Sequence, residues 1–143
     1  MNMTAAIGVL CWMAASAYGE SVAIVKKVEG KVLAQRGGVT HSVKKGEFVQ
    51  ETEILHTFEK SSVGLIFNDG TLVSLGPKSI LSLNRYRFDP AENGYEWDMT
   101  LKRGSAAVES GKIGKLSPES VRFRVPQGIV GIRGTRFIVE VEE

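Results

Sequence analysis

His41 and His56, the only histidines of the chain, are the first candidates for metal or acid–base chemistry. They stand 15 residues apart, on separate turn or strand segments. A metal site built on two histidines needs at least a third ligand, and no carboxylate stands at ligand spacing around them. We therefore expect solvated or hydrogen-bonded histidines, with no metal site and no cofactor.

Carboxylates are the next candidates, because hydrolases that act on polymers use two of them about 5 to 10 Å apart across a cleft. Asp69 lies in the stretch Asn68–Thr71, which is typical of a turn whose side chains bond to their own backbone. Glu96 and Asp98 share one strand face, and no neighbour of theirs or of Glu109 indicates a raised pKa. The chain has no Gly-x-Ser-x-Gly elbow. We expect no catalytic residue and no enzyme, and an envelope-polymer hydrolase is the least favoured alternative.

Three glycines, Gly128, Gly131 and Gly134, repeat at every third position within the stretch PQGIVGIRGTRF. A phosphate-binding loop would need a helix after them, because the free N–H groups of a helix N-terminus bind the phosphate. Residues 135–141 instead alternate like a strand. Glycine within strands marks bends and bulges, and Pro126 cannot donate a ladder hydrogen bond. We therefore predict a corner between two sheets, from Pro126 to Gly134.

The elements that position these residues are all predicted to be strands. Val63, Leu65 and Phe67 alternate inward, and Asp69-Gly70 then gives a strong hairpin signal. Residues 84–104 predict a longer hairpin, 105–108 a further short strand, and 121–125 and 137–141 two more alternating strands. Phe48, Ile54 and Phe58 are also expected to point inward. No run of ten or more residues after residue 20 has helical periodicity.

These patterns predict an all-β fold with many short strands in one compact sandwich or rolled sheet. A short β-solenoid is the alternative. Length and composition suit one domain, over residues 20–143.

Residues 1–19 contain no Lys, Arg, Asp or Glu, and their apolar run is too short to span a bilayer. They predict an N-terminal signal helix, cleaved after Ala17 or Gly19, and therefore a periplasmic or secreted protein. The alternative is an uncleaved apolar element. Cys11, the only cysteine, lies in this segment, so the processed chain would have no thiol and no membrane-spanning segment.

Positive charge gathers toward the C-terminal end of the chain. Residues 101–139 hold eight Lys and Arg against two Glu, a local net charge of +6 in a chain of +2. Such a cluster attracts anionic partners, here an envelope protein or an anionic envelope component. A solvated face that discourages edge pairing is the alternative, and nothing indicates nucleic acid. The candidate binding residues are Lys102, Arg103, Arg122, Arg124, Arg133 and Arg136.

Four blocks resemble the FecR domain family in the order in which that family has them. They are GEFVQETEILHT (46–57), SSVGLIFNDGTLVSLGPKSIL (61–81), LKRGSAAV (101–108) and FRVPQGIVGIRGTRFIVEV (123–141). The resemblance spans about residues 24–141. In the family's founding role, a periplasmic FecR domain is joined through one membrane helix to a cytoplasmic segment that acts on a sigma factor.

This chain differs from that arrangement, because it shows neither a spanning helix nor a cytoplasmic segment. The resemblance therefore implies a stand-alone, extracytoplasmic β-domain that acts as a non-catalytic protein- or envelope-binding module. The alternative is a periplasmic sensory component of a transmembrane signalling system, working with a separate membrane-spanning regulator.

Overall fold

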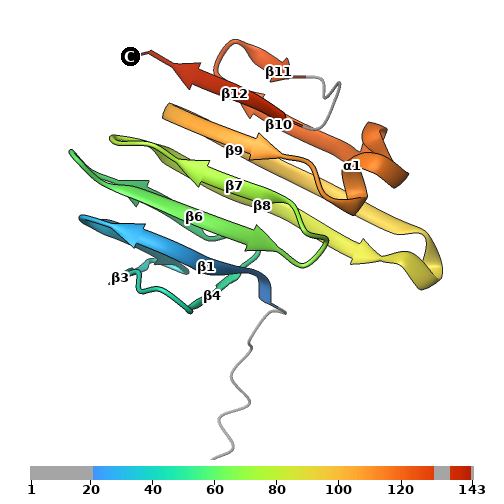
Figure 1. Ribbon diagram of the computed structural model, residues 1–143, viewed down its shortest axis with the longest axis horizontal. Helices are drawn as coiled ribbons and strands as arrows, with labels where there is room; N and C mark the ends of the chain where they lie inside the picture. The colour runs from blue at the N-terminus through green and yellow to red at the C-terminus, as the bar shows by residue number, and fades with distance from the viewer. Residues whose placement is uncertain (1–20, 131–135, 143) are drawn as a thin grey trace, which may run out of the picture.

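A computed structural model describes residues 21–130 and 136–142 of the chain (Figure 1). These residues form twelve strands, one short α-helix and two turns of 3-10 helix. The strands are β1 (Ser21–Glu29), β2 (Val32–Arg36), β3 (Val39–Ser42), β4 (Phe48–Gln50), β5 (Ile54–Thr57), β6 (Ser62–Phe67), β7 (Leu72–Leu75), β8 (Ile80–Asp89), β9 (Gly94–Glu109), β10 (Val121–Val125), β11 (Gly128–Val130) and β12 (Arg136–Val141). The helices are η1 (Pro90–Glu92), α1 (Lys112–Leu116) and η2 (Pro118–Ser120).

The strands form one sheet that rolls into two layers over a common core. Nine strands follow the order β3-β2-β5-β8-β9-β7-β6-β1-β4, and each neighbouring pair is antiparallel. β10 adds to β9 in parallel, β11 pairs with β10, and β12 pairs with β9. We call β4, β1, β6, β7, β12 and the end of β9 layer A, and β3, β2, β5, β8, β10, β11 and the start of β9 layer B. The expected rolled, all-β sheet is confirmed, and antiparallel pairing of this kind is not that of a solenoid.

β9 connects the two layers. Its first part pairs with β8 and β10, and its last part pairs with β7 and β12. Between these parts, Gly104 has a φ of +91°, in the region that favours glycine. The predicted short strand at 105–108 is therefore the second half of one 16-residue strand.

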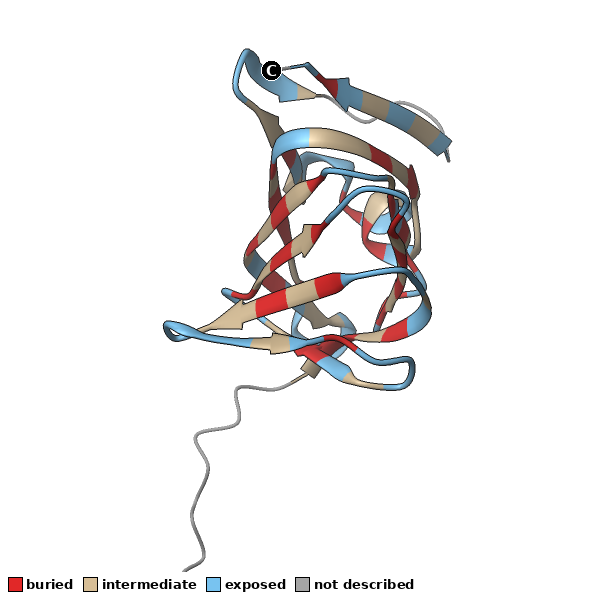
Figure 2. Cartoon of the chain, turned by 90° about the vertical axis from the view of Figure 1, so that its left-hand side faces the viewer, coloured by how far each residue is buried: buried red, intermediate tan, exposed pale blue. Residues whose placement is uncertain are grey.

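The core is built from the inward residues of both layers, and buried positions alternate along the strands (Figure 2). Val63, Leu65 and Phe67 are buried as predicted. Trp97 and Phe123 stack within layer B, with ring centroids 5.9 Å apart. Trp97 also contacts Phe67 of layer A at 6.0 Å, and Phe123 contacts Phe137 of layer A at 5.7 Å. Such aromatic contacts add to the stabilisation that burial itself gives.

The inward positions predicted for residues 48–58 are wrong by one residue. Val49, Leu55 and Thr57 are buried there, whereas Phe48 is 63% exposed and Phe58 is 38% exposed. Because side chains alternate across a strand, a register error of one residue moves every side chain to the other face.

Two further expectations need correction. Helix α1 is present, although its five residues are too few to show helical periodicity. The predicted corner begins as a tight turn at Pro126 and Gln127, but Gly128–Val130 is a strand that pairs back on β10. The change of layer occurs between β11 and β12, and Gly131 and Gly134 lie outside the described residues.

Candidate functional site

The outer face of layer B carries three of the six predicted binding residues. Lys102 and Arg103 lie just before the bend of β9, and Arg122 lies on the adjacent strand β10; all three are exposed. The pKa of His56, on β5 of the same layer, is lowered by its burial and by the charges of Arg103 and Lys102. Both cations therefore lie close enough to His56 to disfavour its protonated form.

Arg124 belongs to the same face and forms an ion pair with Asp98. Its Nε donates to Asp98 Oδ1 at 2.9 Å, and its Nη2 donates to Asp98 Oδ2 at 3.1 Å. Asn84 Nδ2 also donates to Asp98 Oδ1, at 3.1 Å, and to Thr100 Oγ1, at 2.7 Å. Burial alone would raise the pKa of Asp98, but the hydrogen bonds from Arg124 and Asn84 and the nearby charges of Arg124 and Arg122 lower it overall.

The two remaining candidates are not part of this face. Arg136 begins β12 in layer A, where its Nη2 lies 3.5 Å from Glu109 Oε2. Arg133 lies outside the described residues. The predicted basic region therefore reduces to Lys102, Arg103 and Arg122, with Arg124 beside them.

The carboxylates considered for hydrolysis each lie next to an arginine rather than to one another. Glu96 pairs with Arg85 at 3.8 Å, and Asp98 and Glu109 pair as described above. A general acid needs a raised pKa, whereas the pKa of Asp98 is lowered. These contacts favour structural roles for the carboxylates.

Asp69 lies in the predicted turn between β6 and β7, and Gly70 beside it has a φ of +89°. The structure adds that Asp69 is only 2% exposed and joins three elements. Its Oδ2 accepts bonds from Thr71 Oγ1 at 2.7 Å and from the backbone N–H of Ile113 at 3.0 Å. Its Oδ1 accepts from the Tyr86 hydroxyl at 2.9 Å.

The network around Asp69 links three elements of the fold. Burial, together with the negative charge of Asp69, raises the pKa of Tyr86 far above its ordinary value. Tyr86 is therefore protonated at neutral pH, and its hydroxyl donates to Asp69. This network fixes α1 and β8 against the β6–β7 turn.

Glu53 is a buried charge that the sequence interpretation missed. It is 1% exposed and pairs with Arg36, whose Nε and Nη2 lie 3.0 and 2.9 Å from Glu53 Oε1. A buried carboxylate is tolerated only when it is paired and hydrogen-bonded in this way. Its signal in the sequence is only a charged residue next to an apolar strand, which does not predict burial.

The histidines do not form a metal site with their neighbours. His41 Nε2 lies 3.2 Å from Glu47 Oε2, while the charges of Arg103 and Lys102 act on His56. Within residues 21–130 and 136–142, no group of three His, Cys, Asp or Glu side chains is placed to hold a metal ion.

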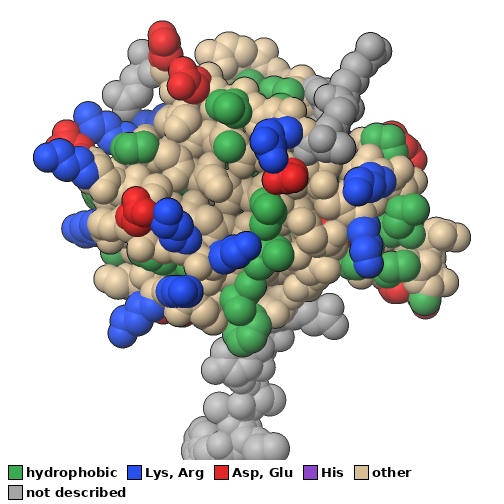
Figure 3. All heavy atoms as spheres, viewed as in Figure 1, with side chains coloured by type: hydrophobic (Ala, Val, Ile, Leu, Met, Phe, Trp, Pro, Cys, Tyr) green, Lys and Arg blue, Asp and Glu red, His purple; other side chains and the backbone are tan. Residues whose placement is uncertain are grey.

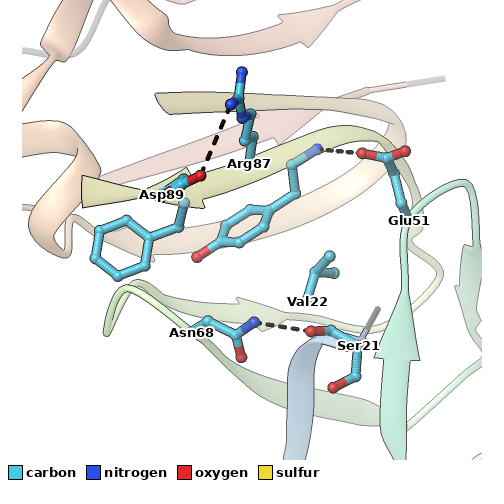
Figure 4. A pocket seen from close by; sticks show the side chains of 8 residues that line it. Ser21, Val22, Glu51, Asn68, Arg87 and Asp89 are labelled. Atoms are coloured by element: carbon cyan, nitrogen blue, oxygen red, sulfur yellow. Dashed lines mark hydrogen bonds and ion pairs between the residues drawn. The ribbon is translucent and has the colours of Figure 1, made fainter. Parts of the chain in front are cut away.

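A cavity of about 510 Å³ opens beside the start of β1 (Figure 4). Ser21 and Asn68 lie on one side of it, and Arg87 and Asp89 on the other. Asn68 Nδ2 donates to the Ser21 carbonyl at 2.8 Å, and Arg87 lies 3.8 Å from Asp89. The size suits a small molecule, but these polar groups already have partners within the wall.

Comparison with known proteins identifies the class of domain. The sequence model of the family described as "FecR protein" matches residues 53–143, well over half of the chain. The chain belongs to the FecR family. The match begins at Glu53, after β4, so it starts later than the sequence blocks had suggested.

Two further comparisons leave the family assignment unchanged. A solved structure titled "Cell surface anchoring domain" is similar with 30% sequence identity and a TM-score of 0.45, over 46% of this chain and 88% of that chain. The curated proteins contain no match to the chain. Among the described residues, no helix is long and apolar enough to cross a membrane.

Proposed function

We propose that the protein is an extracytoplasmic, non-catalytic module that binds an envelope protein or an anionic envelope component. The observation that carries the proposal is that Lys102, Arg103 and Arg122 are exposed on one face, the outer face of layer B. Several cations on one face attract anionic partners. The partner we expect is therefore acidic or phosphorylated, and its binding should weaken as salt screens the charges.

Membership of the FecR family and the apolar segment at residues 1–19 support the location. A segment of this length followed by small residues is typical of a secretory signal. The binding role requires the extracytoplasmic location, because envelope phosphates and acidic glycans are available only to an exported chain.

The test is capture from envelope extract on immobilised protein. The double variant Lys102→Glu/Arg122→Glu should lose its captured partner, and so should the wild type in high salt. The matched control is Lys112→Glu/Lys115→Glu, which makes the same charge change at two exposed residues of α1. Equal capture by both variants, or no partner in mild salt under several growth conditions, would contradict the proposal.

Membership of the FecR family supports a second candidate role. In it, the protein is the sensory component of a signalling system and acts through a separate membrane-spanning regulator. Deleting the protein should then alter at least one response that depends on an extracytoplasmic sigma factor. If every such response is unchanged, this role is excluded.

A further inference from the structure

The outer face of layer A carries a continuous row of apolar side chains. Phe48 on β4 is opposite Ile24 on β1, Ile24 is opposite Ile66 on β6, and Ile66 is opposite Leu72 on β7. We call Phe48, Ile24, Ile66 and Leu72 the apolar row. They point outward, because the residues that follow Phe48, Ile24, Ile66 and Leu72 along each strand are buried.

The row is partly exposed: Phe48 lies in solvent, whereas Ile24, Ile66 and Leu72 are half-buried. Figure 3 shows a column of apolar side chains crossing this face, with Lys and Arg side chains on both sides. Phe48 is 63% exposed, and Ile138 on β12 is 72% exposed. Single exposed apolar residues are ordinary, but a contiguous patch framed by charge marks an interaction surface.

Three lysines lie beside the row. Lys26, Lys27 and Lys45 surround a shallow hollow of about 490 Å³, whose floor includes Gly64 and Leu72. A bulge in β1 between Val25 and Lys27 places two consecutive lysines on the exposed side. Among the residues that the structure describes, no carboxylate lines this hollow.

These lysines are largely available to a ligand. Lys27 pairs with Glu29 at 2.9 Å, but both side chains are well exposed, and such pairs contribute little. Within the described residues, no carboxylate lies at ion-pair distance from Lys26 or Lys45.

We infer that the outer face of layer A binds an anionic lipid surface, with the apolar row in the headgroup–acyl boundary and the three lysines on lipid phosphates. This inference rests on the proposed extracytoplasmic function and names a partner for it. Apolar side chains and cations on one face act together at a membrane, since each alone gives only weak attachment. The central strands of layer A are paired on both sides, so their backbones are not free to add a peptide strand.

The test is co-sedimentation of the protein, purified from its own cells, with two kinds of vesicle. One kind is phosphatidylcholine, and the other is an equimolar mixture of phosphatidylcholine and phosphatidylglycerol. We expect binding to the anionic vesicles and little to the neutral ones. Phe48→Ser/Ile66→Thr should weaken it about ten-fold or more. Lys26→Gln/Lys45→Gln should do the same, since each lysine near an anionic surface contributes about 1 kcal/mol.

The control pair, Lys112→Gln/Lys115→Gln, should bind like the wild type, and circular dichroism should show that every variant keeps its strands. Failure to bind anionic vesicles, or equal binding to both kinds, would overturn the inference. Loss of binding only in Lys102→Gln/Arg122→Gln would overturn it too, while leaving the proposed function intact. A dimer in solution that Phe48→Ser/Ile66→Thr dissociates would also overturn it, by showing that a second copy covers this face.

Discussion

At the residue scale, the fold depends on a few buried carboxylates that join distant segments. Asp69 accepts hydrogen bonds from Thr71, Tyr86 and Ile113, which come from the turn, β8 and α1. A buried charge is costly unless its oxygens are fully bonded. The network therefore stabilises this arrangement only when all its donors are present.

We predict that Asp69→Asn destabilises the fold by about 2–4 kcal/mol, because one carboxylate oxygen becomes an NH₂ group that faces donors. Tyr86→Phe removes a single donor and should cost about 1–2 kcal/mol. Urea unfolding measures both. Wild-type stability in Asp69→Asn would contradict the assigned network.

A pH dependence follows from Asp98. Its pKa is lower in the folded chain than its ordinary value of 3.8. Ionisation therefore favours the folded state, a contribution that is complete above about pH 4 to 5 and is lost as the pH falls through the folded pKa. The urea midpoint of the wild type should drop as the pH falls below about 5 and through the folded pKa of Asp98. Asp98→Asn should show a smaller drop, and an identical drop would exclude this role of Asp98.

The sequence predicted the turn at Asp69 but not its burial. The turn is local, since Asp-Gly between two apolar runs suffices to predict it. Burial depends on Tyr86 and Ile113, which lie 17 and 44 residues away along the chain. The basic face could likewise be predicted only in part. Lys102, Arg103 and Arg122 are candidates from the sequence alone, whereas the pairing of Arg124 with Asp98 depends on the parallel pairing of β10 with β9.

At the element scale, the bend of β9 at Gly104 controls how the two layers meet. A Cβ atom there would collide with the backbone and side chain of Ser79, and φ is +91°. Gly38, in the β2–β3 turn, has a similar φ of +83°, but a Cβ atom added to it would have no other atom within 4 Å. Comparing an alanine at each of the two positions therefore separates the cost of backbone strain from the cost of the collision.

We predict that Gly104→Ala costs on the order of 3 kcal/mol or more, because it adds overpacking to strain. Gly38→Ala should cost about 1–2 kcal/mol, from the left-handed backbone alone. Thermal or urea unfolding compares them. Equal costs would show that the bend tolerates a side chain.

The presence of a strand was easier to predict than which of its residues face the core. The alternation of Val63, Leu65 and Phe67 fixed β6 correctly, because no bulge or turn interrupts it. Around Phe48 and Leu55, an intervening turn changes which residues face inward, and large size alone suggested the wrong ones. The apolar row was not predicted for the same reason. The residue type of Phe48 does not tell whether its side chain points inward or outward.

At the scale of the whole molecule, the roll leaves two outer faces of different chemistry. Layer B presents Lys102, Arg103 and Arg122, while layer A presents the apolar row with its lysines. A module that rests on a lipid surface with one face and recruits an acidic partner with the other needs no reacting group. It needs only a rigid core, which the paired strands and the stack of Trp97 on Phe123 supply.

Both faces have these roles only if the chain leaves the cytoplasm. The most direct test is N-terminal sequencing of the protein recovered from the envelope fraction. We expect the chain to begin at Tyr18 or Glu20, as cleavage after Ala17 or Gly19 would leave it. A chain found in the cytoplasm with residues 1–19 intact would contradict the account.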